Sequence, residues 1–122
     1  MKKHATAPSG QHVDKRHEKE TEAWIASQSR LLRMRATVSG MVQGVGFRYF
    51  TVLAAQRLNI TGWVRNMRNG NVQVEAQGSQ QALFAMYERL SEGPRWSRID
   101  HVAVENIPLE QGEREFRVMK DA

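Results

Sequence analysis

The sequence predicts an α+β domain in which two helices pack on one face of an antiparallel β-sheet. Three observations lead to this fold class. Four segments have the apolar–polar alternation or the β-rich composition of strands. Two segments between them repeat apolar residues every three or four positions, as amphipathic helices do. The resulting order, β-α-β-β-α-β with a short strand at the C-terminus, is typical of a two-layer sandwich.

The first strand and the first helix meet at a glycine-containing corner. Apolar and polar residues alternate from Met34, which predicts a strand that ends near Val42. From Phe47 to Leu58 the apolar residues recur at spacings of three and four, which predicts an amphipathic helix. Residues 43–46 therefore connect the strand to the helix.

A β-hairpin follows the first helix. Strands are predicted over Thr61–Asn66 and from Val72 to Gly78. The dipeptide Asn69-Gly70 between them is the strongest short hairpin signal, because both residues accept the positive φ angles of a tight turn.

The second helix is predicted to begin after Ser79, whose hydroxyl can cap it, and to end at Gly93-Pro94. Alternation returns between Ile99 and Ile107 and predicts the fourth strand. Phe116 and Val118 predict a last short strand at the C-terminus. With right-handed crossovers, the expected strand order is 4-1-3-2, which is the order of the ferredoxin-like sandwich.

Length and composition limit the classes of protein. We expect one domain, residues 31–122, preceded by an N-terminal leader, residues 1–30, that is mobile or partly helical. The chain has no cysteine, which excludes disulfides, thiolate metal sites and a cysteine nucleophile, and which fits a cytoplasmic protein. No apolar run is long enough to span a membrane, so no membrane partner is expected. The net charge of +5 favours an anionic partner, either nucleic acid or a small phosphate ester.

The corner between the first strand and the first helix has the residues of an anion site. A helix N-terminus carries backbone N–H groups without partners, and the helix dipole adds positive potential there. Gly44 and Gly46 let the backbone direct these N–H groups toward one point, and Arg48 follows within the first turn. The third glycine of a dinucleotide fingerprint is absent, as is the Gly-Lys-Ser/Thr of a P-loop. From these residues alone, a tight turn with a surface arginine and a phosphate-binding loop both remain open.

Two longer motifs resemble the signatures of the acylphosphatase family. The first is VSGMVQGVGFR, residues 38–48, and the second is GWVRN, residues 62–66, followed by Gly70, Val72 and Gly78. Both match at every position that defines them, in the right order and spacing, and the similarity covers roughly Arg33 to Lys120.

The resemblance implies hydrolysis of an acyl phosphate to a carboxylate and inorganic phosphate. By matching positions, Arg48 is the phosphate-binding arginine and Asn66 holds the attacking water. The backbone N–H groups of the loop are the further phosphate donors, at Gln43, Gly44, Val45, Gly46 and Phe47. We therefore expect an enzyme that uses a small-molecule acyl phosphate, with no cofactor, no metal and no covalent intermediate. Independently of the resemblance, we expect a cytoplasmic protein, and nothing in the sequence suggests more than a monomer.

The chemistry of an acyl phosphate agrees with such a site. Its leaving group is a carboxylate with a pKa of about 4, so no general acid is needed. Phosphoryl transfer through a loose transition state requires mainly positioning and charge stabilisation. An arginine and a set of N–H donors can stabilise the charge, and an amide can orient the water.

Two other functions are compatible with the same fold. RNA-recognition domains share the β-α-β-β-α-β order, but they stack bases on aromatic residues of the two central strands. Neither the first nor the third predicted strand carries an aromatic residue, which argues against nucleic acid as a partner. An inactive anion-binding or regulatory module is the second alternative, because fold alone does not determine function. The presence of both Arg48 and Asn66 disfavours it.

Overall fold

A computed structural model describes residues 19–22 and 30–122 of the chain. Most of the expected N-terminal leader therefore lies outside the described residues, and residues 19–22 form a helical turn. No helix in these described ranges is long and apolar enough to cross a membrane.

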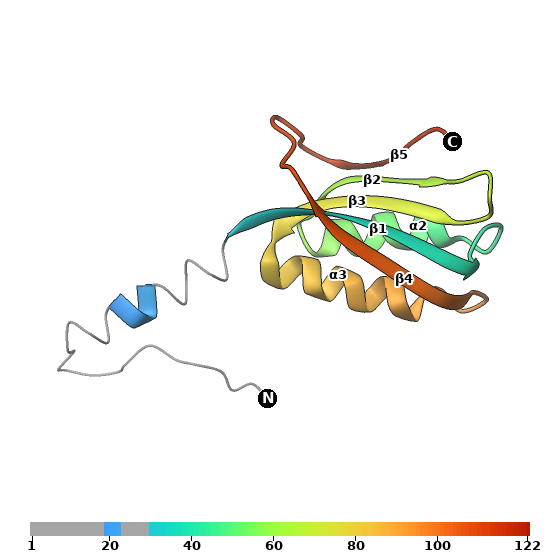
Figure 1. Ribbon diagram of the computed structural model, residues 1–122, viewed down its shortest axis with the longest axis horizontal. Helices are drawn as coiled ribbons and strands as arrows, with labels where there is room; N and C mark the ends of the chain where they lie inside the picture. Colours follow the sequence, from blue (N-terminus) through green and yellow to red (C-terminus); the bar gives the residue numbers. More distant parts are fainter. Residues whose placement is uncertain (1–18, 23–29) are drawn as a thin grey trace.

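The strands and helices of the domain follow one another in the predicted order (Figure 1). They are β1 (Leu31–Met41), α2 (Phe47–Arg57), β2 (Thr61–Asn66), β3 (Val72–Ser79), α3 (Gln80–Glu92), β4 (Arg98–Ile107) and β5 (Phe116–Val118). The predicted helix boundaries are confirmed closely. The Ser79 hydroxyl accepts a hydrogen bond from the Ala82 N–H at 3.0 Å, and Gly93 is the C-cap of α3.

The sheet has the order β4-β1-β3-β2-β5, so the expected 4-1-3-2 arrangement is confirmed for its four longer strands. These four pair antiparallel, but β5 pairs parallel to β2, and the sheet is therefore mixed rather than purely antiparallel. The direction of the chain explains the difference. After β4 the chain reverses and crosses to the opposite edge, where β5 runs in the same direction as its neighbour β2.

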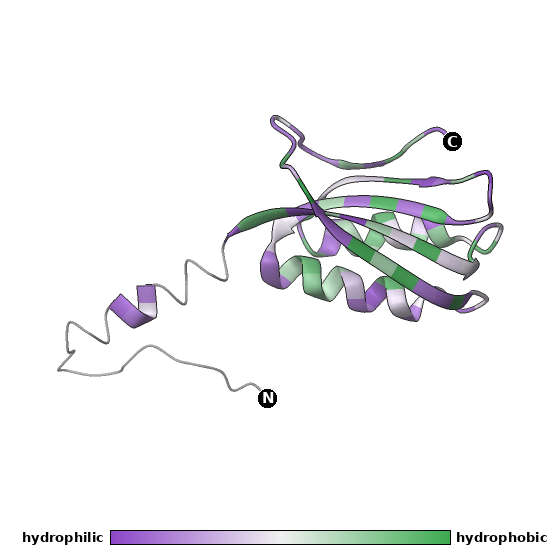
Figure 2. Cartoon of the chain, viewed as in Figure 1, coloured by the Kyte–Doolittle hydropathy of each residue, from purple (hydrophilic) through white to green (hydrophobic). Residues whose placement is uncertain are grey.

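Both helices cover the same face of the sheet, and the core lies between the two layers (Figure 1). Figure 2 shows the strands as alternating hydrophobic and hydrophilic bands, as the sequence pattern predicts. The buried apolar side chains come from every element except β4, and those of the long strands and helices are Met34, Ala36, Val38, Phe47, Ala54, Ala55, Val64, Val72, Val74, Ala76, Leu83, Met86 and Leu90.

The register of the central strands positions the corner between β1 and α2. Val38 near the end of β1 pairs with Val72 at the start of β3, and Val72 pairs on its other side with Asn66 at the end of β2. The β1–α2 corner and the β2–β3 turn therefore lie at the same end of the sheet.

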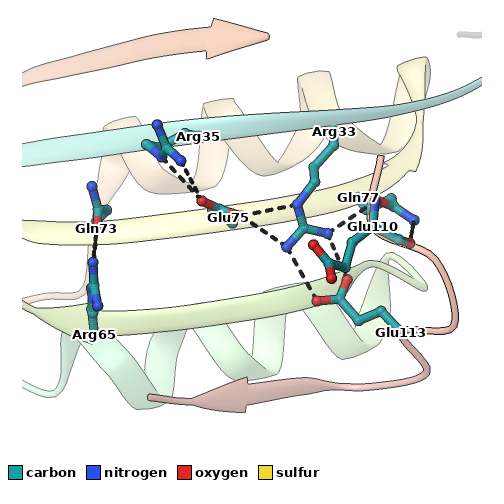
Figure 3. Close-up of polar contacts among 8 residues, drawn as sticks. All are labelled: Arg33, Arg35, Arg65, Gln73, Glu75, Gln77, Glu110 and Glu113. Atoms are coloured by element: carbon teal, nitrogen blue, oxygen red, sulfur yellow. Dashed lines mark hydrogen bonds and ion pairs between the residues drawn. The ribbon is translucent and has the colours of Figure 1, made fainter. Parts of the chain in front are cut away.

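β1 begins at Leu31, three residues before the predicted start at Met34. The sequence pattern did not reveal this extension because Leu31 is exposed and Arg33 is buried, against the usual preferences of these residues. Arg33 is only 2% exposed and projects from the sheet face opposite the helices. There it lies among side chains of β3 and of the β4–β5 connection (Figure 3).

Two carboxylates compensate the buried charge of Arg33. Its guanidinium donates to both oxygens of Glu113, with Nη1 2.8 Å from Oε1 and Nη2 3.2 Å from Oε2. It also donates from Nε to Glu75 at 3.0 Å and from Nη1 to the amide oxygen of Gln77 at 3.1 Å. A buried arginine needs such partners because an unpaired charge in this environment costs several kcal/mol. The cluster holds the β4–β5 connection, and hence the approach to β5, against the sheet.

The ion cluster shifts the ionisation of its acid. Burial by itself would raise the pKa of the Glu113 carboxyl, but hydrogen bonds from Arg33 and Thr61 outweigh that effect and lower it from the ordinary 4.5. The folded protein therefore binds this proton less readily than the unfolded chain does. A lowered pKa of an acid stabilises the fold above its ordinary pKa, and this contribution is lost as the pH falls through the lowered value.

We expect Glu113→Gln to lower the free energy of unfolding by about 2 kcal/mol at pH 7, because the amide leaves part of the Arg33 charge uncompensated. The difference from wild type should shrink as the pH falls through the lowered pKa of Glu113, because the wild-type carboxyl then becomes protonated and loses its charge. Urea denaturation at several pH values measures both effects. Glu115→Gln, at an exposed position of the same connection, is the matched control and should change stability little at either pH. An equal loss of stability at pH 7 and at the lowest pH measured would contradict the ion-pair explanation.

Candidate active site

The corner between β1 and α2 depends on two glycines. Gly44 has φ 76° and Gly46 has φ 81°, in the left-handed region that residues with a Cβ rarely adopt. No atom lies within 4 Å of where a Cβ would stand on either residue, so backbone conformation rather than space requires glycine. Gly46 is the N-cap of α2, and no side chain caps the helix.

The first turn of α2 presents free backbone donors. Within the described ranges, no backbone N–H of residues 44–49 donates to a protein acceptor; the first to do so is that of Phe50, to the Gly46 carbonyl at 3.0 Å. The first turn also contains no acidic residue. The helix dipole therefore acts at this end without a compensating negative side chain. These features are those of an anion site.

Arg48 lies in this first turn and is 42% exposed. Its guanidinium Nη1 lies 3.4 Å from a carboxylate oxygen of Asp121, which is itself 63% exposed. An exposed pair at this distance is weak, because solvent screens it. The guanidinium is therefore available to a more strongly bound anion.

Asn66 is the last residue of β2 and approaches the same end of the sheet. Its backbone carbonyl accepts a hydrogen bond from the Ala122 N–H at 3.0 Å. Its side-chain amide, in contrast, makes no hydrogen bond to any of the residues that the structure describes. The amide keeps both its donor and its acceptor capacity.

A hollow of about 520 Å³ joins these features. We call it the α2 hollow; its lining comprises Val42, Gly44, Gly46, Phe47, Arg48, Tyr49, Val52, Asn66 and Val118. The structure thus brings Arg48 and Asn66 to one cavity, although β2 and α2 are separate elements. Gly44, Gly46 and Phe47 of the predicted loop line it as well.

Two residues of the predicted phosphate loop have side chains with another role. The Gln43 amide nitrogen donates to the Met67 carbonyl at 2.7 Å and to the Asn71 carbonyl at 2.8 Å. It thereby connects the β1–α2 corner to the β2–β3 turn. Val45 is half-buried and packs against the core. Neither side chain lines the α2 hollow.

The C-terminal segment also contributes to the site, and no motif in the sequence predicts this. The Met119 N–H donates to the Val64 carbonyl at 2.8 Å, and the Arg68 N–H donates to the Ala122 carbonyl at 2.6 Å. These bonds continue the pairing of β5 along β2 and bring Asp121 to Arg48. No local signal marks Asp121, because its partner lies 73 residues away in the chain.

Other features of the described residues form no comparable site. A second hollow of about 310 Å³ lies between α2 and α3, but its lining mixes Arg57 and Arg89 with Glu88 and Glu92. Within residues 19–22 and 30–122, no three His, Cys, Asp or Glu side chains are grouped so that they could hold a metal ion. His101 is exposed on β4.

Comparison with known proteins points to one family. The model of the acylphosphatase family matches residues 34–118. An acylphosphatase of Bifidobacterium longum is 53% identical over 85 residues, which cover 70% of this chain and 88% of that protein. An acylphosphatase of Koribacter versatilis is 39% identical over 118 residues, which cover 97% of this chain and 96% of that protein. The crystal structure of acylphosphatase from Bacillus subtilis superposes with a TM-score of 0.70 at 33% identity, and covers 74% of this chain and 99% of that chain.

Gln43→Ala should destabilise the protein by about 1–2 kcal/mol, because two carbonyls of the β2–β3 turn lose their donor. Gln43→Glu should be worse, since it places a carboxylate against the same two oxygens with no proton to donate. Urea denaturation at pH 7 compares the two variants. Gln56→Ala, an exposed position on α2, is the control and should change stability by no more than about 0.5 kcal/mol. A Gln43→Glu variant as stable as wild type would show that the amide does not hold the corner.

Proposed function

The chain belongs to the acylphosphatase family, whose reaction is the hydrolysis of acyl phosphates, and we propose that its active site is the α2 hollow. The observation that carries this proposal is the meeting of Arg48 and Asn66 in one cavity at an uncapped helix N-terminus. The two side chains have complementary capacities, a fixed positive charge and a neutral amide.

The backbone and Arg48 bind the phosphoryl group. The free N–H groups of the corner and of the first turn of α2 donate to the phosphate oxygens, and the guanidinium of Arg48 makes a charge-assisted, two-pronged contact. These donors are already in place before the substrate arrives. Preorganised donors cost little reorganisation when charge develops in the transition state, which is the main source of catalysis in phosphoryl transfer.

Asn66 orients the attacking water. Its carbonyl oxygen accepts a hydrogen bond from the water, and its amide nitrogen can donate a second hydrogen bond to the same water. The water attacks phosphorus in line with the bond to the acyl oxygen. That bond breaks, and the carboxylate departs with the electron pair. The oxygen of the water becomes the new oxygen of inorganic phosphate, and its two protons remain on phosphate oxygens, which gives H2PO4⁻.

This reaction requires neither a metal nor a covalent enzyme intermediate. The carboxylate leaving group is stable without protonation, since its pKa is about 4. Arg48 and the backbone donors supply the positive field that a metal provides in other phosphoryl-transfer enzymes. Water is the nucleophile, so no side chain has to be activated.

The carboxylate of Asp121 pairs with the guanidinium of Arg48 when no substrate is bound. Its carboxylate is a single exposed charge at 3.4 Å, whereas a phosphoryl group brings several oxygens and also engages the backbone N–H groups. The substrate therefore displaces Asp121 from the guanidinium without opening a buried ion pair.

Arg48→Gln should reduce kcat/KM for benzoyl phosphate by about a hundredfold or more, because it removes a cation that stabilises the transition state. The rate of benzoyl phosphate hydrolysis, measured with EDTA present, gives the comparison with wild type. The wild-type rate should persist in EDTA, with competitive inhibition by inorganic phosphate. Arg68→Gln, at an exposed arginine that does not line the α2 hollow, should retain most of the activity. Loss of wild-type turnover in EDTA would refute the metal-independent mechanism.

Asn66→Ala should lose activity to a similar extent while it still binds inorganic phosphate, because only the water loses its orientation. Phosphate affinity is measured by calorimetry or by protection against thermal unfolding. Asn106→Ala, on an exposed position of β4, is the matched control. If Asn66→Ala keeps the full rate, Asn66 does not hold the nucleophile. If the variant loses both activity and phosphate binding, the role of Asn66 is in binding phosphate.

A further inference from the structure

The α2 hollow has an apolar wall that the proposed mechanism does not use. Arg48, Asn66 and the glycine backbone form its polar side. Tyr49, Val52 and Val118 line it as well, and none of them has a group suited to bind phosphate or to activate water. A site that recognised phosphate alone would have no need of this wall.

The wall is accessible and comes from two elements. Tyr49 is 68% exposed and Val118 is 51% exposed, while Val52 is half-buried. Tyr49 and Val52 are three residues apart on α2 and therefore lie on the same side of the helix. Val118 ends β5, beside Val64 of β2. Exposed apolar side chains are common singly, but these border a single cavity next to the anion site.

The geometry of an acyl phosphate requires a second subsite. One bridging oxygen joins the phosphoryl group to the acyl carbon, so an acyl group bound in line must leave the phosphate site on a neighbouring surface. An apolar surface favours an acyl group that displaces water from it. A tyrosine ring adds a flat contact for an aromatic group, because aromatic pairs gain more than area burial alone.

We propose that Tyr49, Val52 and Val118 form an acyl-binding wall, and that the preferred substrates are acyl phosphates with an apolar, aromatic or bulky acyl group. This inference rests on the proposed function, since the wall has this role only if the phosphoryl group occupies the polar side of the α2 hollow. The carboxylate of Asp121 beside Arg48 adds a negative charge near the cavity and disfavours an acyl group with a second carboxylate.

The test compares benzoyl phosphate with acetyl phosphate in wild type and in two variants of the wall. Tyr49→Ala should lower the ratio of kcat/KM for benzoyl phosphate over acetyl phosphate by about tenfold, and Val118→Ser by about threefold, because each removes contact made only by the larger acyl group. Tyr87→Ala on α3 and Val104→Ser on β4 are the matched controls, since their side chains are exposed outside the hollow. Both controls should leave the ratio unchanged.

Inhibition by inorganic phosphate separates a role in acyl binding from a general disturbance of the site. The inhibition constant should stay within about twofold of wild type in Tyr49→Ala and Val118→Ser. An unchanged substrate ratio in both variants, or an equal loss for both substrates, would overturn the acyl-binding wall and leave the proposed function intact. No turnover of either substrate by wild type would instead refute the proposed function.

Discussion

The candidate site depends on the antiparallel register of β1 on β3. Because Val38 pairs with Val72, and Val72 pairs with Asn66, the end of β1 and the β2–β3 turn lie at the same end of the sheet. A one-residue slip would turn the core face of the strand outward, so burial of the apolar residues of β1 and β3 maintains this register. The amide of Gln43 then joins the two corners directly, through two carbonyls of the β2–β3 turn.

The second constraint is that the backbone N–H groups in the first turn of α2 have no acceptor among the described residues. The side chain of Ser, Thr, Asp or Asn at the N-cap accepts a hydrogen bond from one of the first N–H groups of a helix, and such a cap stabilises the helix by about 1 kcal/mol. Here the N-cap is Gly46 and no side chain caps the helix, whereas α3 is capped by Ser79. One helix thus forgoes the cap where the proposed mechanism needs free donors, and the other retains it. The same contrast distinguishes the corner proposed to bind phosphate from the capped start of α3 within a single small domain.

The C-terminal part of the chain contributes to the site through a buried charge cluster far from it. Arg33 holds Glu113 of the β4–β5 connection, and that connection leads into β5 and the last residues. β5 supplies Val118 to the cavity and the following residues bring Asp121 to Arg48. The ionic contacts of Arg33, on the sheet face opposite the helices, therefore help to position the segment that brings Val118 and Asp121 to the α2 hollow. In these contacts Arg33 and Arg35 of β1 form ion pairs within the protein, with Glu75 of β3 and, for Arg33, also with Glu113.

The element order and the helix and turn signals can be read from the amino-acid sequence alone. So can the identity of Arg48 and Asn66 as the residues that the acylphosphatase resemblance singles out. These follow from local rules, since periodicity, caps and turn residues act over a few positions, and the motifs are contiguous. Three features depend instead on the folded chain: Arg33 is buried, β5 lies parallel to β2, and the C-terminal segment brings Val118 to the cavity and Asp121 to Arg48. Those features join residues up to 80 positions apart, and no local pattern records such a pairing. Gln43 belongs to both groups. The motif marks its position in the sequence, but only the fold shows that its amide binds the carbonyls of Met67 and Asn71.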